Sequence, residues 1–190
     1  MNDIDWELVS GTISFYKTID YSYIEVPWFC QSEALNTTLP PGKHGMMAWH
    51  PTITPGYLVG SAEQSFIQMM LDDKLNKGKY CAATPCFRDD TIDELHSLSF
   101  FKVELIEINP KDKNIDSILT DAKINMEGIL YRNFLPLTIS IKETAAGKDL
   151  YYNDIEVGSY GYREYKGYSW IYGTGLALPR FSQAMSKFKE

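Results

Sequence analysis

The stretch from Cys86 to Glu104, CFRDDTIDELHSLSFFKVE, has the pattern of a strand, a polar loop and a returning strand. The first strand ends near Arg88, and the second opens at Phe100 and then alternates polar and apolar residues, as half-buried strands do. An arginine at a strand end can fork onto a phosphate, and a phenylalanine can stack on a flat base. The hairpin is therefore a candidate nucleotide clamp; the alternative is an ordinary hairpin with a surface arginine.

This stretch resembles motif 2 of the class II aminoacyl-tRNA synthetases, and within them the aspartyl/asparaginyl branch. That branch has Phe-Arg-Asp-Glu, a loop with an Arg or His, and a Phe that stacks on adenine. The matching positions follow without a gap and are Arg88, Asp90, His96 and Phe100. The resemblance implies that these residues bind ATP. Asp90 stands where the family usually has Glu, and so does Ser99 just before the Phe.

Composition favours a single domain over residues 1–190, because 44% of the chain is apolar and can form a core. No apolar run reaches the roughly 18 residues of a membrane span, and we expect neither a span nor a secretion signal. The net charge of −7 argues against a basic nucleic-acid-binding face. The cysteines, Cys30, Cys81 and Cys86, are odd in number and form no CxxC, which favours reduced thiols in a cytoplasmic protein over a zinc site.

The segment before the hairpin has a helix-like run from Ile13 to Ile19 and then an extended apolar run from Tyr23 to Phe29, broken by Pro27. This order is similar to motif 1, which builds the dimer interface of the family. The resemblance implies a homodimer formed through residues 13–29. Residues 31–58 are dense in proline and glycine, which predicts loop rather than long regular elements.

Ser61 to Leu75 is predicted to be a helix, with Ser61 as its N-cap and Gln64 completing a capping box. Its segment Gln64-Ser-Phe-Ile-Gln68 resembles one that precedes motif 2 in the aspartyl branch. The first Gln of that segment holds the ammonium group of the substrate, which implies that Gln64 binds the amino acid. The lysine with which the family helps bind an aspartate side chain is replaced by Ile67.

Residues 114–130 are predicted to form an amphipathic helix and residues 137–142 a strand, and the alternation from Asp149 to Arg163 predicts a strand or hairpin. Two carboxylates near phosphates suit Mg²⁺, whereas the alternative is a glycine-rich bend with solvated acids. The aspartyl/asparaginyl branch has an Asp, a Glu and an Arg at closely similar spacing. The resemblance implies that Asp149 and Glu156 serve Mg²⁺ and ATP, and that Arg163 grips the side chain of the amino acid.

The stretch from Ser169 to Arg180 is predicted to form a strand, a glycine turn at Gly173 and Gly175, and a helix that carries Arg180. It resembles motif 3, whose arginine binds the γ-phosphate and packs on adenine opposite Phe100. Its sequence, Leu-Ala-Leu-Pro-Arg, is more similar to the seryl branch than to the aspartyl branch. With motifs 1 and 2, the resemblance covers roughly residues 20–185.

The resemblance implies an α+β fold, a class II synthetase-like sheet of six or seven mostly antiparallel strands flanked by helices. It also implies an ATP-dependent ligase in which Arg88 and Arg180 are the catalytic residues. We expect activation of aspartate or a close analogue as an aminoacyl-adenylate, followed by transfer to ammonia, as in asparagine synthetase A, or to a carrier protein or small metabolite. A tRNA acceptor is not expected without a partner subunit, because no room remains for an anticodon-binding domain. The alternatives are a non-catalytic regulatory or scaffolding paralogue and a tRNA-binding module.

Overall fold

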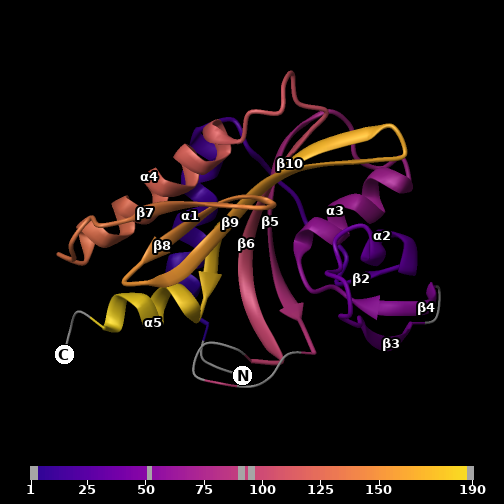
Figure 1. The fold of residues 1–190 in the computed structure, drawn as a ribbon, viewed down its shortest axis with the longest axis horizontal. Coiled ribbons are helices and arrows are strands. Elements are labelled where there is room, and N and C mark those ends of the chain that lie inside the picture. Colours follow the sequence, from indigo (N-terminus) through magenta and orange to yellow (C-terminus); the bar gives the residue numbers. More distant parts are fainter. Residues whose placement is uncertain (1–3, 51–52, 90–92, 94–96, 188–190) are drawn as a thin grey trace.

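The computed structural model describes residues 4–50, 53–89, 93 and 97–187. Its centre is a seven-stranded sheet in the order β1-β5-β6-β10-β9-β8-β7 (Figure 1). Every neighbouring pair is antiparallel except β1 and β5, which are parallel. The predicted α+β class and the mostly antiparallel sheet are therefore confirmed. The strands are β1 Ser22–Tyr23, β5 Gly78–Phe87, β6 Ser99–Ile108, β7 Ser140–Thr144, β8 Gly147–Tyr152, β9 Ile155–Tyr165 and β10 Tyr168–Leu178.

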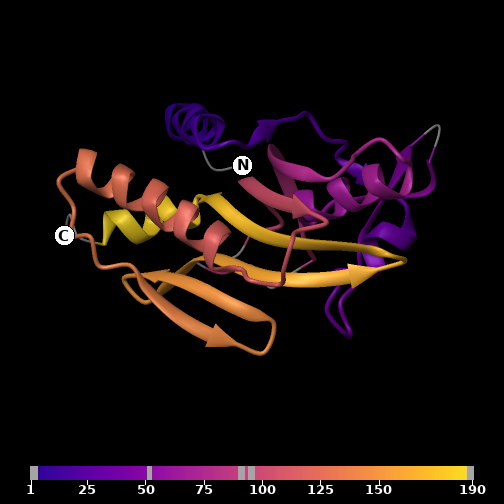
Figure 2. The same cartoon turned by 90° about the horizontal axis from the view of Figure 1, so that it is seen from above.

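Helices cover both faces of this sheet. Leu105 and Ile106 are neighbours on β6 and belong to different apolar clusters, because successive strand side chains point to opposite faces. The Leu105 face packs against α1 (Trp6–Thr18), α4 (Asp116–Arg132) and α5 (Arg180–Ser186), and Figure 2 shows α1 and α4 on the same side of the strands. The Ile106 face packs against α3 (Ala62–Leu71), with α2 (Ser32–Asn36) beside it. None of the described helices is long and apolar enough to span a membrane.

Residues 31–58 are not the loop that the sequence predicts. They contain α2 and most of a second sheet, with the order β2-β4-β3, formed by β2 Phe29–Cys30, β3 Met46–His50 and β4 Ile53–Leu58. The pairing register of β3 and β4 shifts between Ala48 and His50, opposite the part of β4 that contains Pro55. A bulge is one of the few places where a strand accepts proline, and this explains how a proline-rich sequence still forms a sheet.

The N-terminal segment also departs from its prediction. The helix begins at Trp6, well before Ile13, because the side chain of Asp5 caps it by accepting a hydrogen bond from the Leu8 N–H at 3.0 Å. The extended run over residues 23–29, which proline was expected to stop, is divided between β1 and β2, and these strands belong to different sheets. Pro27 lies between them, and its carbonyl accepts a hydrogen bond from the Ser65 hydroxyl at 2.7 Å, which ties this connection to α3.

The predicted hairpin from 149 to 163 is confirmed as β8 and β9, but the glycine turn expected before Arg180 is wrong. Gly173 and Gly175 lie inside β10, where they make room for two buried tyrosine rings. A Cβ atom at Gly173 would lie 2.6 Å from the Tyr160 ring, and one at Gly175 would lie 2.7 Å from the Tyr16 ring. These glycines are needed for close packing rather than for a turn, and Pro179 makes the transition from β10 to α5.

We predict opposite effects for the same substitution at two glycines. Gly173→Ala should destabilise the chain by about 2 kcal/mol, because the fully buried Tyr160 ring has no space to move away. Gly128→Ala is the matched control: it lies within α4 with open space around its Cβ, and it should stabilise by about 0.5–1 kcal/mol. Chemical denaturation of both variants measures the difference, and equal free energies of unfolding would contradict this packing.

Candidate active site

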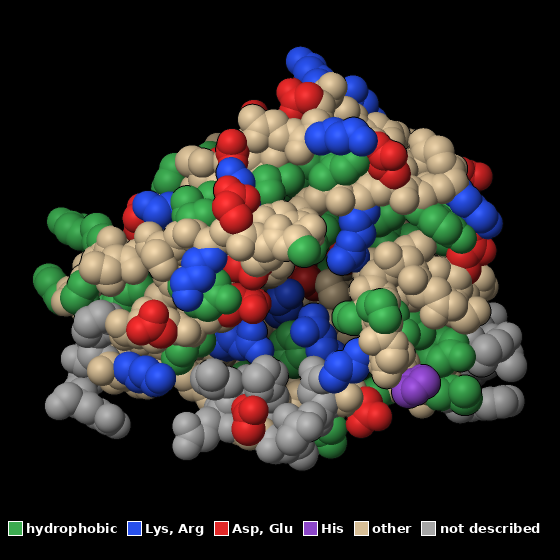
Figure 3. Space-filling model, in the orientation of Figure 1, with side chains coloured by type: hydrophobic (Ala, Val, Ile, Leu, Met, Phe, Trp, Pro, Cys, Tyr) green, Lys and Arg blue, Asp and Glu red, His purple; other side chains and the backbone are tan. Residues whose placement is uncertain are grey.

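A cavity of about 400 Å³ opens on the α3 face of the large sheet. Its walls come from segments far apart in the sequence: the end of β5 and start of β6, the N-terminus of α3, strands β9 and β10, the start of α5 and the loop after α2. In the space-filling view the face is hollowed at its centre, with Lys and Arg side chains around the hollow (Figure 3). The cavity therefore gathers basic side chains in a chain whose net charge is negative.

One end of the cavity holds the residues of the predicted nucleotide clamp. Arg88 follows β5 directly, its Nε donates to the Gly60 carbonyl at 3.1 Å, and its Cζ lies 5.0 Å from the centroid of the Phe100 ring. Both side chains line the cavity. The two other predicted ATP ligands of this hairpin, Asp90 and His96, lie outside the described residues.

Arg180 lines the same cavity from the first turn of α5. Its Nη1 lies 3.4 Å from the Glu156 carboxylate of β9, in an ion pair whose members are both partly exposed. Arg180 and Arg88 thus line the same cavity, as the resemblance to motifs 2 and 3 implies.

The predicted metal ligands are not equivalent. Glu156 lines the cavity, whereas Asp149 is buried on β8 and is not part of the lining. In the described ranges, no three or more His, Cys, Asp or Glu side chains are grouped so that they could hold a metal ion. The donor set therefore does not amount to a protein-built metal site, and a Mg²⁺ ion here would take most of its ligands from a bound triphosphate and water.

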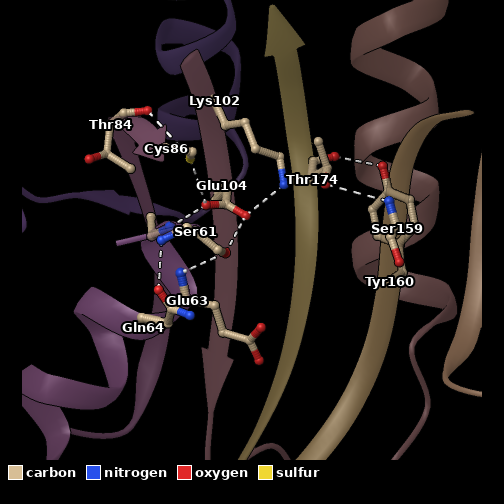
Figure 4. Close-up of polar contacts among 12 residues, drawn as sticks. Ser61, Glu63, Gln64, Thr84, Cys86, Lys102, Glu104, Ser159, Tyr160 and Thr174 are labelled. Atoms are coloured by element: carbon tan, nitrogen blue, oxygen red, sulfur yellow. Dashed lines mark hydrogen bonds and ion pairs between the residues drawn. The ribbon is translucent and has the colours of Figure 1, made fainter. Parts of the chain in front are cut away.

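The floor of the cavity is a buried carboxylate network that the sequence did not single out. Glu104 on β6 is 5% exposed. It accepts hydrogen bonds from the Ser61 hydroxyl at 2.8 Å, from the Ala62 N–H and from the Lys102 ammonium at 2.8 Å (Figure 4). Ser61 caps α3, since its hydroxyl oxygen accepts from the Glu63 N–H. A negative charge at the N-terminus of a helix is favourable, so the network fixes where α3 begins.

Burial opposes the ionisation of Glu104 more strongly than any single contact favours it. The Lys102 charge and the hydrogen bonds from Lys102, Ser61 and Ala62 together outweigh burial and lower the pKa of Glu104 below its ordinary value. The cavity floor is consequently ionic at neutral pH, with a paired carboxylate and ammonium.

Gln64 lines the cavity but is only 4% exposed, and both ends of its amide already have partners. Its Oε1 accepts from the Gly60 N–H at 2.7 Å, and its Nε2 donates to the Thr38 hydroxyl at 2.9 Å. The predicted capping box is displaced by one residue, because its backbone partner is Gly60 rather than Ser61. An amide oxygen has a second lone pair, so the binding of an ammonium group by Gln64 stays a prediction.

Arg163 lines the cavity beside α3 and is paired with a residue of that helix. Its Nη1 donates to Glu63 Oε2 at 2.9 Å, and its Cζ lies 4.5 Å from the centroid of the Tyr172 ring. The other oxygen of Glu63 accepts from the Trp170 indole N–H at 2.7 Å. Burial is the main reason why the pKa of Glu63 is raised, although Arg163 opposes the rise.

Glu63 is thus the partner of Arg163 that the sequence missed, and it weighs against the predicted preference for aspartate. The replacement of the family's lysine by Ile67 does not change the pocket, because Ile67 is 1% exposed, packs in the core and does not line the cavity.

The sequence contained one signal for the residues of the cavity floor. Lys102 and Glu104 alternate with apolar neighbours after Phe100, but this polar face covers the cavity floor instead of facing solvent.

Glu104→Gln should cost roughly 3 kcal/mol of stability at pH 7, because it leaves the Lys102 ammonium, whose side chain is only 12% exposed, without a countercharge. The folded-state pKa of Glu104 is depressed, so the stability it contributes is present above its unfolded-state pKa of about 4.3 and is lost as the pH falls through the folded-state value. The cost of the substitution should therefore shrink in acid.

The matched control is Glu127→Gln, which breaks the partly exposed Lys123–Glu127 pair of α4. A pair of this kind contributes less than about 1 kcal/mol. Urea unfolding of both variants at a series of pH values provides the comparison. A cost for Glu104→Gln that is small, or that does not change with pH, would contradict the network.

Known structures resemble this chain, although a scan against known sequence families found no match and neither did a search of curated proteins. Two structures of pyrrolysyl-tRNA synthetase from Desulfitobacterium hafniense align over 96% of this chain with a TM-score of 0.69 and 13% identity. The chain covers 67% and 69% of those two structures. Cytoplasmic serine-tRNA ligase from Naegleria fowleri, in complex with AMP, aligns over 94% of this chain with a TM-score of 0.65 and 18% identity.

The chain spans about half, 52%, of the length of that serine-tRNA ligase. The pyrrolysyl and seryl proteins are class II synthetases, so the likeness does not single out the aspartyl/asparaginyl branch. At these identities, the likeness concerns the fold. The chain has the fold of a class II aminoacyl-tRNA synthetase core.

Proposed function

We propose that this chain is an ATP-dependent ligase that activates an amino acid as an aminoacyl-adenylate. One observation carries the proposal: Arg88, from the β5–β6 hairpin, and Arg180, from the last helix, line a single cavity together with the aromatic ring of Phe100. Arginines are suited to phosphate, and an aromatic ring is suited to a base. Their grouping in one cavity supports a nucleotide site, as does a similarly folded serine-tRNA ligase that was solved with AMP.

The clamp leaves donors for a phosphate. Within the described part of the chain, the one hydrogen bond of the Arg88 side chain uses Nε, and the guanidinium has further N–H donors on the Nη atoms. We assign the α-phosphate to Arg88, the adenine to the Phe100 ring and the γ-phosphate to Arg180. Glu156 pairs with Arg180 in the absence of nucleotide. This 3.4 Å ion pair is partly exposed and weak, so a phosphate can replace the carboxylate when the nucleotide binds.

The reaction needs no side-chain base in this site. The carboxylate of the amino acid is already ionised at neutral pH and attacks the α-phosphorus, forming an acyl–phosphate bond while the bond to pyrophosphate breaks. The cationic side chains stabilise the charge that develops on the phosphate oxygens, and the cavity holds the two reactants in line. Mg²⁺, where bound, would neutralise the triphosphate, with Glu156 as its candidate protein ligand.

We place the amino acid at the α3 end of the cavity, where Gln64, Glu63 and Arg163 line the wall. The acceptor that we propose is not tRNA but ammonia, a carrier protein or a small metabolite. The net charge of −7 supports this choice, since a surface that grips nucleic acid concentrates lysine and arginine. A non-catalytic paralogue with the same fold is the alternative, and it would retain nucleotide binding at most.

A homodimer through residues 13–29 remains part of the proposal. In this segment β1 forms one edge of the large sheet. Its Tyr23 is 38% exposed, and the nearby Trp28 is 53% exposed. Exposed aromatic side chains beside a sheet edge are suited to an interface. Sedimentation at micromolar concentration should give a dimer mass.

Arg88→Ala and Arg180→Ala should each lower the rate of amino-acid-dependent ATP–pyrophosphate exchange by at least about 100-fold, because each removes a charge-assisted contact to the reacting phosphates. Both side chains are at least partly exposed, so the fold should persist, as circular dichroism would show.

The matched control is Arg132→Ala, an exposed arginine at the end of α4 that does not line the cavity. Its exchange rate should equal that of the unmodified chain. Exchange that survives in either active-site variant would refute the assigned phosphate site. Nucleotide binding without exchange for any of the twenty amino acids would favour the non-catalytic paralogue.

A further inference from the structure

The amino-acid end of the cavity contains two ion pairs, and each cation is matched by a carboxylate of the protein itself. Arg163 pairs with Glu63 at 2.9 Å, and Lys102 pairs with Glu104 at 2.8 Å. Both carboxylates are nearly buried, with Glu63 7% and Glu104 5% exposed. The wall that would meet the substrate side chain is therefore polar but has no excess charge.

Glu63 is held in this position from two sides. Its Oε1 accepts from the Trp170 indole at 2.7 Å, while its Oε2 accepts from Arg163. Its backbone belongs to the first turn of α3, and the N–H donates to the capping hydroxyl of Ser61, which is itself bonded to Glu104. The Glu63 carboxylate cannot swing away from Arg163 without also losing the hydrogen bond from Trp170.

An acidic substrate side chain would have to take Arg163 from Glu63. A buried carboxylate that loses its cation carries a large desolvation penalty, because the remaining contact with Trp170 is a single hydrogen bond. An acidic ligand would also add a third negative charge next to Glu63 and Glu104. Both effects disfavour aspartate and glutamate at this position.

We propose that the Glu63–Arg163 pair selects an amino acid whose side chain is small, uncharged and able both to donate and to accept hydrogen bonds. This class comprises serine, threonine, asparagine and glutamine, and the inference rests on the function proposed above. The guanidinium has five N–H donors, of which the pair uses one on Nη1, and the carboxylate oxygens have further lone pairs. A hydroxyl or amide can bind to both partners without separating them, and Tyr172 closes the side of the subsite.

The test measures kcat/KM for ATP–pyrophosphate exchange with these four amino acids, aspartate, glutamate, alanine and leucine. Calorimetric titration of the same panel follows, in the presence of a non-hydrolysable ATP analogue. The best neutral polar amino acid should exceed aspartate and glutamate by at least about 100-fold. A preference for an acidic or an apolar amino acid would overturn the proposal.

A second arm uses Glu63→Gln, which keeps the shape of the side chain and can still accept from Trp170, but removes the charge that balances Arg163. The variant should raise the ratio of kcat/KM for aspartate over asparagine by roughly 10-fold or more. The matched control is Glu164→Gln, the adjacent residue of β9, whose exposed carboxylate pairs with Lys113 outside the cavity. Its ratio should not change. An unchanged ratio in Glu63→Gln would contradict the role of the pair.

The two arms separate this inference from the proposed function. Calorimetric binding with a neutral polar preference but no exchange would support the subsite and refute activation. Exchange with aspartate as the best substrate would support activation and refute the subsite. Neither binding nor exchange with any member of the panel would refute both.

Discussion

The position of Glu104 is the constraint on which the cavity depends. It lies on β6, an interior strand of the large sheet, and is bonded to the start of α3 through the Ser61 hydroxyl and the Ala62 N–H. That helix start in turn sets the backbone of Gly60, whose N–H is bonded by Gln64 and whose carbonyl is bonded by Arg88. A single buried carboxylate thus connects the sheet, the start of α3 and, through Gly60, Arg88, and Lys102 supplies its countercharge.

The charges of the cavity are distributed in a way that fits a two-substrate site. At the α3 end, the cations Arg163 and Lys102 are each satisfied by a nearly buried carboxylate. By contrast, Arg88 is exposed, and Arg180 has only a long, partly exposed contact with Glu156. Cations that are weakly held are available to an anionic ligand, whereas buried and matched pairs shape a subsite without attracting one. The contrast supports the proposal of a phosphate-bearing ligand at Arg88 and Arg180 and of an uncharged group beside the matched pairs.

The resemblance to the three motifs predicted the large antiparallel sheet, and strand alternation predicted the hairpin from 149 to 163, because motif spacing and residue alternation are local signals. The sequence did not predict the second sheet of residues 29–58, since a bulge accommodated its prolines, and it misassigned Gly173, whose role depends on a ring distant in the sequence. The partners Glu63 and Glu104 were missed for the same reason: only the fold brings a helix start, a strand centre and Arg163 together.

The central proposal is that this cavity binds ATP, with Arg88 and Arg180 on its phosphates and Phe100 on its adenine. The most direct test is a crystal structure of the chain grown with a non-hydrolysable ATP analogue. The account predicts adenine stacked on the Phe100 ring, the α-phosphate on the guanidinium of Arg88 and the γ-phosphate on Arg180. Nucleotide bound outside this cavity, or bound in it with neither arginine touching a phosphate, would contradict the account.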